Sequence, residues 1–205
     1  MKSIAILGAS GHGKVVAEIA ELCGFQKIVF FDDVKIDVIF ESWEIHGNTK
    51  NLISKLSVFD ACFVAIGDNK IRMEKINLLL SNNANIISLI HPFASVSKYS
   101  KIQKGSVVMA GAVINPFASI GIACIINTNA TVEHDCLIGD GVHISPNAAI
   151  AGGVSIGNQT WIGIGSSVKQ NIIIGHNILL GVGSVVLDDL PDGVTAFGVP
   201  AKIKL

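Results

Sequence analysis

The chain has 205 residues, a formal net charge of -1 at pH 7 and a sequence pI of about 6.6. This balance argues against a nucleic-acid or anionic-membrane partner, because such surfaces need an excess of Lys and Arg. Half of the residues are hydrophobic, and no apolar run approaches the ~18 residues of a membrane span. The N-terminal segment lacks the pattern of a secretory signal, so we expect a cytoplasmic protein.

The four cysteines, Cys23, Cys62, Cys124 and Cys136, form no CxxC pair and show no zinc-ligand spacing. Isolated, buried thiols in a reducing compartment are the simplest interpretation. We therefore expect no disulfide and no bound metal.

Residues 1–90 alternate between apolar runs and helical patterns. SIAILGAS, KIVFFDD and ACFVAIGDN predict strands, with NIISLI as a closing strand, while KVVAEIAELCG and NKIRMEKINLLLSNN predict helices. This alternation predicts a Rossmann-like α/β domain built on a parallel sheet. The stretch VKIDVIFESWEIHGNTK gives no clear pattern, and HPFAS marks a hinge. We therefore place the first domain at residues 1–90 and the second at residues 91–205.

A glycine-rich turn follows the first predicted strand. The segment GASGHGK, residues 8–14, has the P-loop spacing, but Val15 replaces the hydroxyl residue that binds magnesium. Ser10 likewise occupies the second glycine position of the dinucleotide-binding pattern. A tight turn at a helix N-terminus still suits phosphate, and Asp32 and Asp33 end the next strand, where a ribose is often bound. The pattern predicts a nucleotide or nucleotide-sugar site without hydride or phosphoryl transfer, unless the turn is purely structural.

The second half of the chain repeats with a period of six. Every sixth residue from Val96 to Val186 is Val, Ile or Leu, and the residue four positions later is mostly small. Gly, Asn and Asp, which favour turns, lie between these positions. The pattern predicts an all-β parallel β-helix in which each hexapeptide forms one side and three sides form one coil.

Taken together, GASGHG, FFDD, AIGDN, the segment TVEHDCLIGDGVHISPNAAIAGGVSIG and the C-terminal GVPAK resemble one family. It is the sialic-acid O-acetyltransferase-like family of hexapeptide-repeat sugar acetyltransferases. Within it, the chain is most similar to the UDP-4-amino-sugar N-acetyltransferases of bacillosamine synthesis. The resemblance implies a left-handed β-helix that forms homotrimers, acetyl-CoA as co-substrate and a nucleotide sugar held by the N-terminal domain.

The resemblance also implies roles for particular residues. His134 matches the family's general base, and Asp135 matches a carboxylate that supports this base and is Glu in close relatives. The contacts to acetyl-CoA would come from His143, Ile164, Gly181, Val182 and Gly183, with Val182 standing where the family has Gly. The nucleotide-sugar contacts would come from Ser10, Gly11, His12, Asp32 and Asp33.

The repeat adds a geometric expectation. His134 and His143 are nine residues apart, which is half of an 18-residue coil, so they lie on different sides of one prism. They could meet only across an interface between subunits. Without the motif each would be an ordinary surface His. Trp161 is interpreted as a packing residue and His176 as an ordinary surface residue.

The expected reaction is direct acetyl transfer from acetyl-CoA to a sugar amine, with His134 accepting the proton. No acyl-enzyme is expected at Cys136, which falls on a small inward position. O-acetylation of sialic acid and N-acetylation of a GDP-linked amino sugar remain alternatives. A non-catalytic β-helix scaffold, or a metal-loaded carbonic-anhydrase-like protein, is the alternative of another class, although no third His completes a metal site.

Overall fold

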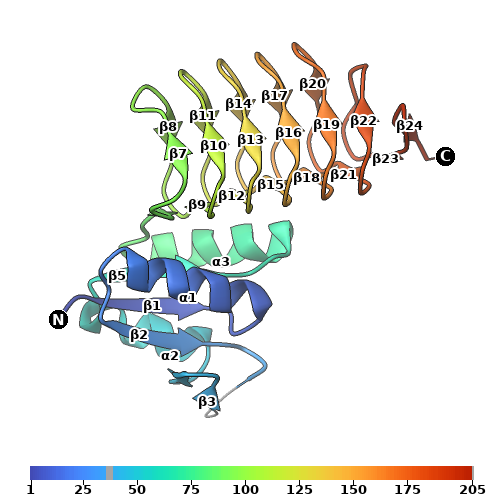
Figure 1. Cartoon of the computed structure of the whole chain (residues 1–205). Coiled ribbons are helices and arrows are strands. Elements are labelled where there is room, and N and C mark those ends of the chain that lie inside the picture. The colour runs from blue at the N-terminus through green and yellow to red at the C-terminus, as the bar shows by residue number, and fades with distance from the viewer. Residues whose placement is uncertain (36–38, 205) are drawn as a thin grey trace. The chain divides into compact units, whose positions relative to one another are not determined.

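The computed structural model describes residues 1–35 and 39–204 of the chain. It divides into two compact units, Met1–His91 and Pro92–Leu205 (Figure 1). The first unit alternates strands and helices, and the second consists of short strands and turns.

The first unit is built on a five-stranded sheet with the strand order β3-β4-β2-β1-β5. The strands are β1 (Ser3–Leu7), β2 (Lys27–Phe31), β3 (Ile39–Phe40), β4 (Trp43–Ile45) and β5 (Ala61–Val64). All neighbours pair in parallel except β3, which lies antiparallel to β4 at the edge. The helices are α1 (Gly11–Leu22), α2 (Thr49–Ser54), the 3₁₀ turn η1 (Leu56–Val58) and α3 (Asn69–Ser81). β1 and β5 are buried along their whole length, as expected for a parallel sheet covered on both faces.

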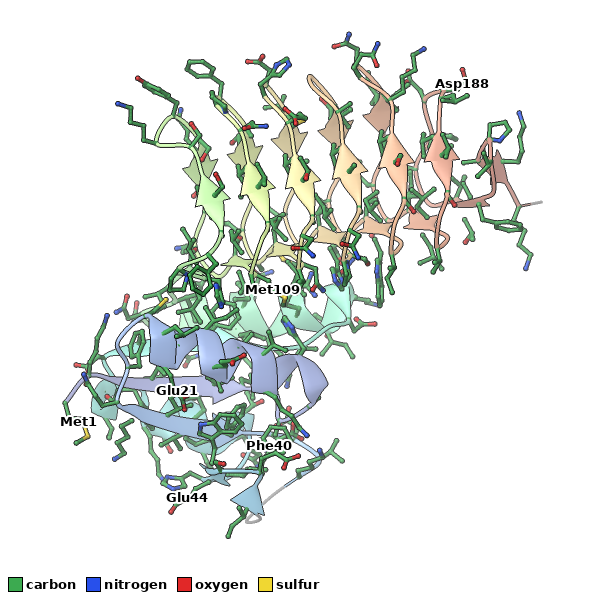
Figure 2. The ribbon with its side chains drawn as sticks, in the orientation of Figure 1. Met1, Glu21, Phe40, Glu44, Met109 and Asp188 are labelled. Atoms are coloured by element: carbon green, nitrogen blue, oxygen red, sulfur yellow. The ribbon has the colours of Figure 1, made fainter. Side chains whose placement is uncertain are left out.

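Two segments differ from the expectation. The stretch without a clear pattern contains β3 and β4, and α2 begins near its end, at Thr49. Phe40, labelled in Figure 2, packs its ring edge-on against Phe30, with ring centroids 5.1 Å apart. The predicted closing strand NIISLI is reduced to an isolated bridge between Cys62 and Ile86 and to the two-residue strand β6 (Leu89–Ile90).

The second unit is a parallel β-helix whose two-residue strands stack at intervals of one coil (Figure 1). Its first face contains β7 (Ser95–Val96), β10 (Val113–Ile114), β13 (Thr131–Val132), β16 (Ala149–Ile150), β19 (Ser167–Val168) and β22 (Val185–Val186). Its second face contains β8 (Lys101–Ile102), β11 (Ser119–Ile120), β14 (Leu137–Ile138), β17 (Ser155–Ile156) and β20 (Ile173–Ile174). Its third face contains β9 (Val107–Val108), β12 (Ile125–Ile126), β15 (His143–Ile144), β18 (Trp161–Ile162), β21 (Leu179–Leu180) and β23 (Thr195–Phe197). The terminal strand β24 (Lys202–Ile203) pairs with β23 in the antiparallel direction.

The six-residue period is the core of this unit. The aliphatic positions from Val108 to Val186 are buried, and Val96 and Ile102 at the first coil are partly buried against the same core. Four of the small inward residues carry hydroxyls that donate to backbone carbonyl oxygens at 2.7–3.0 Å: Ser106, Thr160, Ser166 and Ser184. The β-helix predicted from the sequence is confirmed.

One residue in every hexapeptide has a left-handed backbone. From Gly105 to Gly183, every sixth residue has a φ between 54° and 76°. Glycine and asparagine fill most of these positions, because they tolerate this conformation best. Asp135 and Gly183 belong to this series, so each fills a turn position that the fold itself demands.

The turns between the second and third faces carry a ladder of polar side chains. The backbone N–H of Ile122 donates to the Asp140 carboxylate at 2.8 Å, and the N–H of Asp140 donates to Asn158 Oδ1 at 2.9 Å. The ladder continues from the Asn158 N–H to His176 Nδ1 and from the His176 N–H to Asp192 Oδ1, both at 2.8 Å. His176 is therefore a structural acceptor, a role that the sequence alone did not indicate.

Candidate functional site

The glycine-rich loop connects β1 to α1 in the predicted tight turn. Gly8 has a φ of 115°, and its N–H donates to the Phe31 carbonyl at 2.8 Å. A Cβ on Gly13 would lie 2.3 Å from the Gly8 oxygen, so only glycine allows this close approach. Ser10 is the N-cap of α1 but makes no side-chain cap hydrogen bond. The Ser10 side chain therefore does not cap the first turn of α1. Uncapped backbone N–H groups at a helix N-terminus are a suitable environment for an anion.

Asp32 braces this loop. Its carboxylate accepts N–H bonds from Ala9 at 2.7 Å, Val34 at 2.8 Å and Lys35 at 2.9 Å. Burial alone would raise the pKa of Asp32, but the three N–H donors and the Lys35 charge hold it below its ordinary value. The Lys35 ammonium also donates to the Ala9 carbonyl at 2.9 Å. The carboxylate therefore already has a structural role in shaping the loop.

Asp33 joins the end of β2 to two helices. It accepts the backbone N–H and the hydroxyl of Thr49, both at 2.8 Å, and forms an ion pair with Lys75 of α3 at 2.5 Å. Burial opposes ionisation, but the bonds from Lys75 and Thr49 hold the pKa of Asp33 below its ordinary value. Its place in a nucleotide-sugar site stays a prediction, as does that of Asp32.

His12 is held neutral at the first turn of α1. Its Nε2 atom is buried and makes no hydrogen bond to any residue that the structure describes. Burial, with a smaller contribution from the Arg72 charge, lowers the pKa of His12 to about 4. Arg72 is 1% exposed and donates to the carbonyl oxygens of Ile66 and Gly67 and to Asn69 Oδ1 at 2.8–2.9 Å. Ser10, Gly11, His12, Asp32 and Asp33 all follow the carboxyl ends of adjacent parallel strands, and so lie at one edge of the sheet.

His134 and Asp135 form an exposed pair at the turn between β13 and β14. His134 Nδ1 lies 2.8 Å from Asp135 Oδ2, and both side chains are 62% exposed. The bond fixes the ring orientation and leaves Nε2 as the nitrogen available to a ligand.

A pocket of about 580 Å³ lies on the third face of the β-helix. Its walls include His143, Ile164, Gly181 and Val182, four of the five residues that the resemblance assigns to acetyl-CoA. Gly183 is not among the lining residues and occupies the next left-handed turn position. The pocket is a groove with mainly apolar walls, as expected for small-molecule sites.

Trp161 also lines this pocket, whereas the sequence predicted only a packing residue. Its ring stacks on His143, with ring centroids 4.9 Å apart and an interplanar angle of 24°. The indole Nε1 donates to Ser145 Oγ at 2.8 Å, and Asn127 Nδ2 lies 3.1 Å from His143 Nε2. The 18-residue spacing from His143 could have indicated this contact, because residues one coil apart are neighbours on a face.

The structure keeps His134 apart from His143 within one chain. His134 lies at the turn between the first and second faces, whereas His143 lies on the third face, opposite that corner of the prism. Their placement on different sides of the β-helix agrees with the nine-residue spacing between them.

Cys136, next to the His134–Asp135 pair in the sequence, lies in the core of the β-helix. Cys136 is fully buried, and burial raises the pKa of its thiol. Its Sγ donates to the Ala151 carbonyl at 3.2 Å. Within residues 1–35 and 39–204 no group of His, Cys, Asp and Glu could hold a metal ion, and no helix is long and apolar enough to cross a membrane.

Comparison with known proteins identifies relatives for the whole chain. Residues 3–79 match the family described as the PglD N-terminal domain. The acetyltransferase domain of PglB from Neisseria gonorrhoeae, solved with acetyl coenzyme A, is 39% identical over 99% of both chains, with a TM-score of 0.95. PerB from Caulobacter crescentus, solved with CoA and GDP-perosamine, is 38% identical over 100% of this chain and 98% of that chain, with a TM-score of 0.95.

A curated relative, UDP-N-acetylbacillosamine N-acetyltransferase from Bacillus subtilis, is 40% identical over 113 residues. This match spans 54% of the chain and 52% of the relative, or about half of its length. The full-length structural matches nevertheless extend over both units at 38–39% identity. The chain therefore belongs to the family of hexapeptide-repeat sugar acetyltransferases that includes the PglB acetyltransferase domain and PerB.

Proposed function

We propose that this protein transfers the acetyl group of acetyl-CoA to the amino group of a nucleotide-linked amino sugar, specifically a UDP-4-amino-4,6-dideoxy sugar. The observation that carries the proposal is the apolar pocket on the third face, which gathers His143, Ile164, Gly181 and Val182. The relatives support the same chemistry, since one was solved with acetyl coenzyme A and another with CoA and GDP-perosamine.

His134 acts as the general base in this proposal. Its imidazole takes a proton from the sugar amine while the nitrogen attacks the thioester carbonyl carbon. The new C–N bond forms, the C–S bond breaks, and the CoA thiolate leaves and is protonated. Asp135, 2.8 Å from Nδ1, stabilises the imidazolium that forms. An imidazole suits this task because it exchanges protons near neutral pH.

The carboxylate role of Asp135 can be separated from its turn role. Asn fills the same left-handed turn position at Asn129 and Asn147 one hexapeptide before and two after, so Asp135→Asn preserves the backbone. Its charge is lost, and we expect kcat to fall while the thermal stability is unchanged. An unchanged kcat in this variant would remove Asp135 from the mechanism.

We also propose a homotrimer in which the acetyl-CoA pocket of one subunit meets His134 of its neighbour. The support is geometric, because the two histidines lie on different sides of one prism. Light scattering coupled to size-exclusion chromatography tests this assembly. A strict monomer at micromolar concentration would contradict it.

The glycine-rich loop would hold the diphosphate of the acceptor. Ser10→Trp fills the turn in front of α1 and should raise the KM for the nucleotide sugar. The KM for acetyl-CoA should hardly change, because CoA is assigned to the other unit. Equal increases in both KM values, with the fold intact, would argue against this placement.

The acceptor is identified by comparing candidate acceptors in separate reactions. Purified protein is incubated with acetyl-CoA and either a UDP-linked or a GDP-linked 4-amino sugar, or with sialic acid, and free CoA thiol is measured. The proposal expects the fastest release with the UDP-linked amine. The GDP-linked sugar is included because the PerB structure holds GDP-perosamine. No thiol release with any acceptor would favour the scaffold alternative.

A further inference from the structure

The turn that carries His134 recurs in every coil, and one position in it is unusual. Residues equivalent to His134 follow at intervals of 18 along the corner between the first and second faces. They are Lys98, Pro116, His134, Gly152, Gln170 and Asp188, the last labelled in Figure 2. Among these six residues only Gly152, one coil after His134, has no side chain.

The His134 ring occupies the space that this glycine leaves. A Cβ on Gly152 would lie 2.6 Å from both Cε1 and Nε2 of His134 and 3.3 Å from Cδ2. Such a contact is shorter than carbon atoms tolerate, so the imidazole could not keep its place beside any other residue. Gly152 is not in the left-handed series, and its own backbone conformation therefore does not require glycine.

The backbone at Gly152 cannot easily withdraw from the ring. Its carbonyl accepts the Asn171 N–H at 3.0 Å, and the next N–H, that of Gly153, donates to the His134 carbonyl at 2.9 Å. Both bonds belong to the repeating ladder that joins successive coils. A methyl group added at position 152 would therefore displace the imidazole and not the coil.

We infer that Gly152 is a positioning residue for the His134 base: its missing side chain leaves the space that the imidazole occupies while Nδ1 is bonded to Asp135. This inference rests on the proposed role of His134. Displacing the ring by about 1 Å would misalign Nε2 with the acceptor amine, and misplacements of this size can cost ~10²-fold in rate.

The test is Gly152→Ala, with Gln170→Ala as the control at the equivalent position of the following coil. We expect Gly152→Ala to lower kcat by roughly 10–100-fold. The KM values for acetyl-CoA and the nucleotide sugar, and the melting temperature, should change little. Gln170→Ala should match the unmodified protein. In spectra of protein carrying ¹⁵N-labelled histidine, the His134 ring signals should shift in Gly152→Ala and stay in place in Gln170→Ala.

A double-variant comparison distinguishes this inference from the proposed function. In a His134→Ala background, adding Gly152→Ala should cause no further loss of rate, because the group it positions is gone. A further loss would show that position 152 acts on the reaction by another route and would overturn the inference. If His134→Ala alone keeps full activity, the proposed function fails; if only Gly152→Ala does, the inference alone fails.

Discussion

Trp161 stacks face to face on His143 from the next coil, with ring centroids 4.9 Å apart. The indole cannot slide along the face, because its Nε1 is bonded to Ser145. This pair forms a rigid wall of the apolar pocket on the third face.

Replacing Trp161 with Ala should raise the KM for acetyl-CoA, because the pocket loses this wall and His143 loses its stacking partner. Trp161→Phe keeps the ring contact and loses only the bond to Ser145. Its KM for acetyl-CoA should therefore lie between those of Trp161→Ala and the unmodified protein. Steady-state kinetics at varied acetyl-CoA give both values. Identical KM values in all three proteins would place acetyl-CoA elsewhere.

His176 should contribute to stability and not to catalysis. Replacing it with Leu leaves the Asn158 N–H without its acceptor, which should cost about 0.5–1.5 kcal/mol of unfolding free energy. His176→Asn offers an amide oxygen at the same turn, as Asn158 does one coil earlier, and should lose less. Urea unfolding of both variants measures the difference. Equal losses would mean that the ladder bond contributes nothing.

Cys136→Ala should leave kcat nearly unchanged, because the thiol is buried in the core and its raised pKa keeps it protonated. Alanine already occupies the equivalent inward position at Ala118, Ala130 and Ala148, so the core accepts it. Kinetics of the variant at pH 7 provide the check. A loss of several orders of magnitude would instead indicate an acyl-enzyme on this cysteine.

The free energy of unfolding of the first unit should decrease as the pH is lowered from 6.5 to 4. The pKa of His12 is about 4 in the folded chain, against an ordinary value of 6.5, so the unfolded chain binds the proton more readily. Stability is therefore complete above pH 6.5 and is lost as the pH falls, by on the order of 2–3 kcal/mol.

Unfolding by urea at pH 7 and at pH 5 measures this loss, with His12→Gln as the control. The variant should show a flatter dependence, since Gln does not titrate. Asp32 and Asp33 do not interfere, because their lowered pKa values place their titration below this window. An equally steep dependence in His12→Gln would assign the loss to another group.

The sequence predicts the second unit well because its rule is local. Each hexapeptide repeats the same inward aliphatic residue, and Val108 to Val186 indeed form one continuous core. The closing strand of the first unit is shorter than its apolar pattern predicts, because pairing to β5 depends on a neighbour that residue patterns do not specify. Only the Cys62–Ile86 bridge forms there among the described residues.

The candidate site was only partly predictable. The spacing of nine residues places His134 and His143 on different sides, and the motif identifies both. The structural duties of Asp32 and Asp33 depend on Ala9, Thr49 and Lys75, which are distant in sequence. Similarly, the space under His134 follows from coil geometry and side-chain direction, which no motif describes.

The most direct test of His134 as the general base is the acetyl-transfer rate of His134→Ala, measured as CoA thiol release with a UDP-linked 4-amino sugar. We expect the variant to keep its fold, because His134 lies outside the inward positions at Val132 and Cys136, which are both fully buried. The rate should fall by roughly 10²–10⁴-fold at pH 7. It should recover in part at higher pH, where the amine loses its proton unaided. A variant with turnover near that of the unmodified protein at pH 7 would contradict the assignment of His134 as the base.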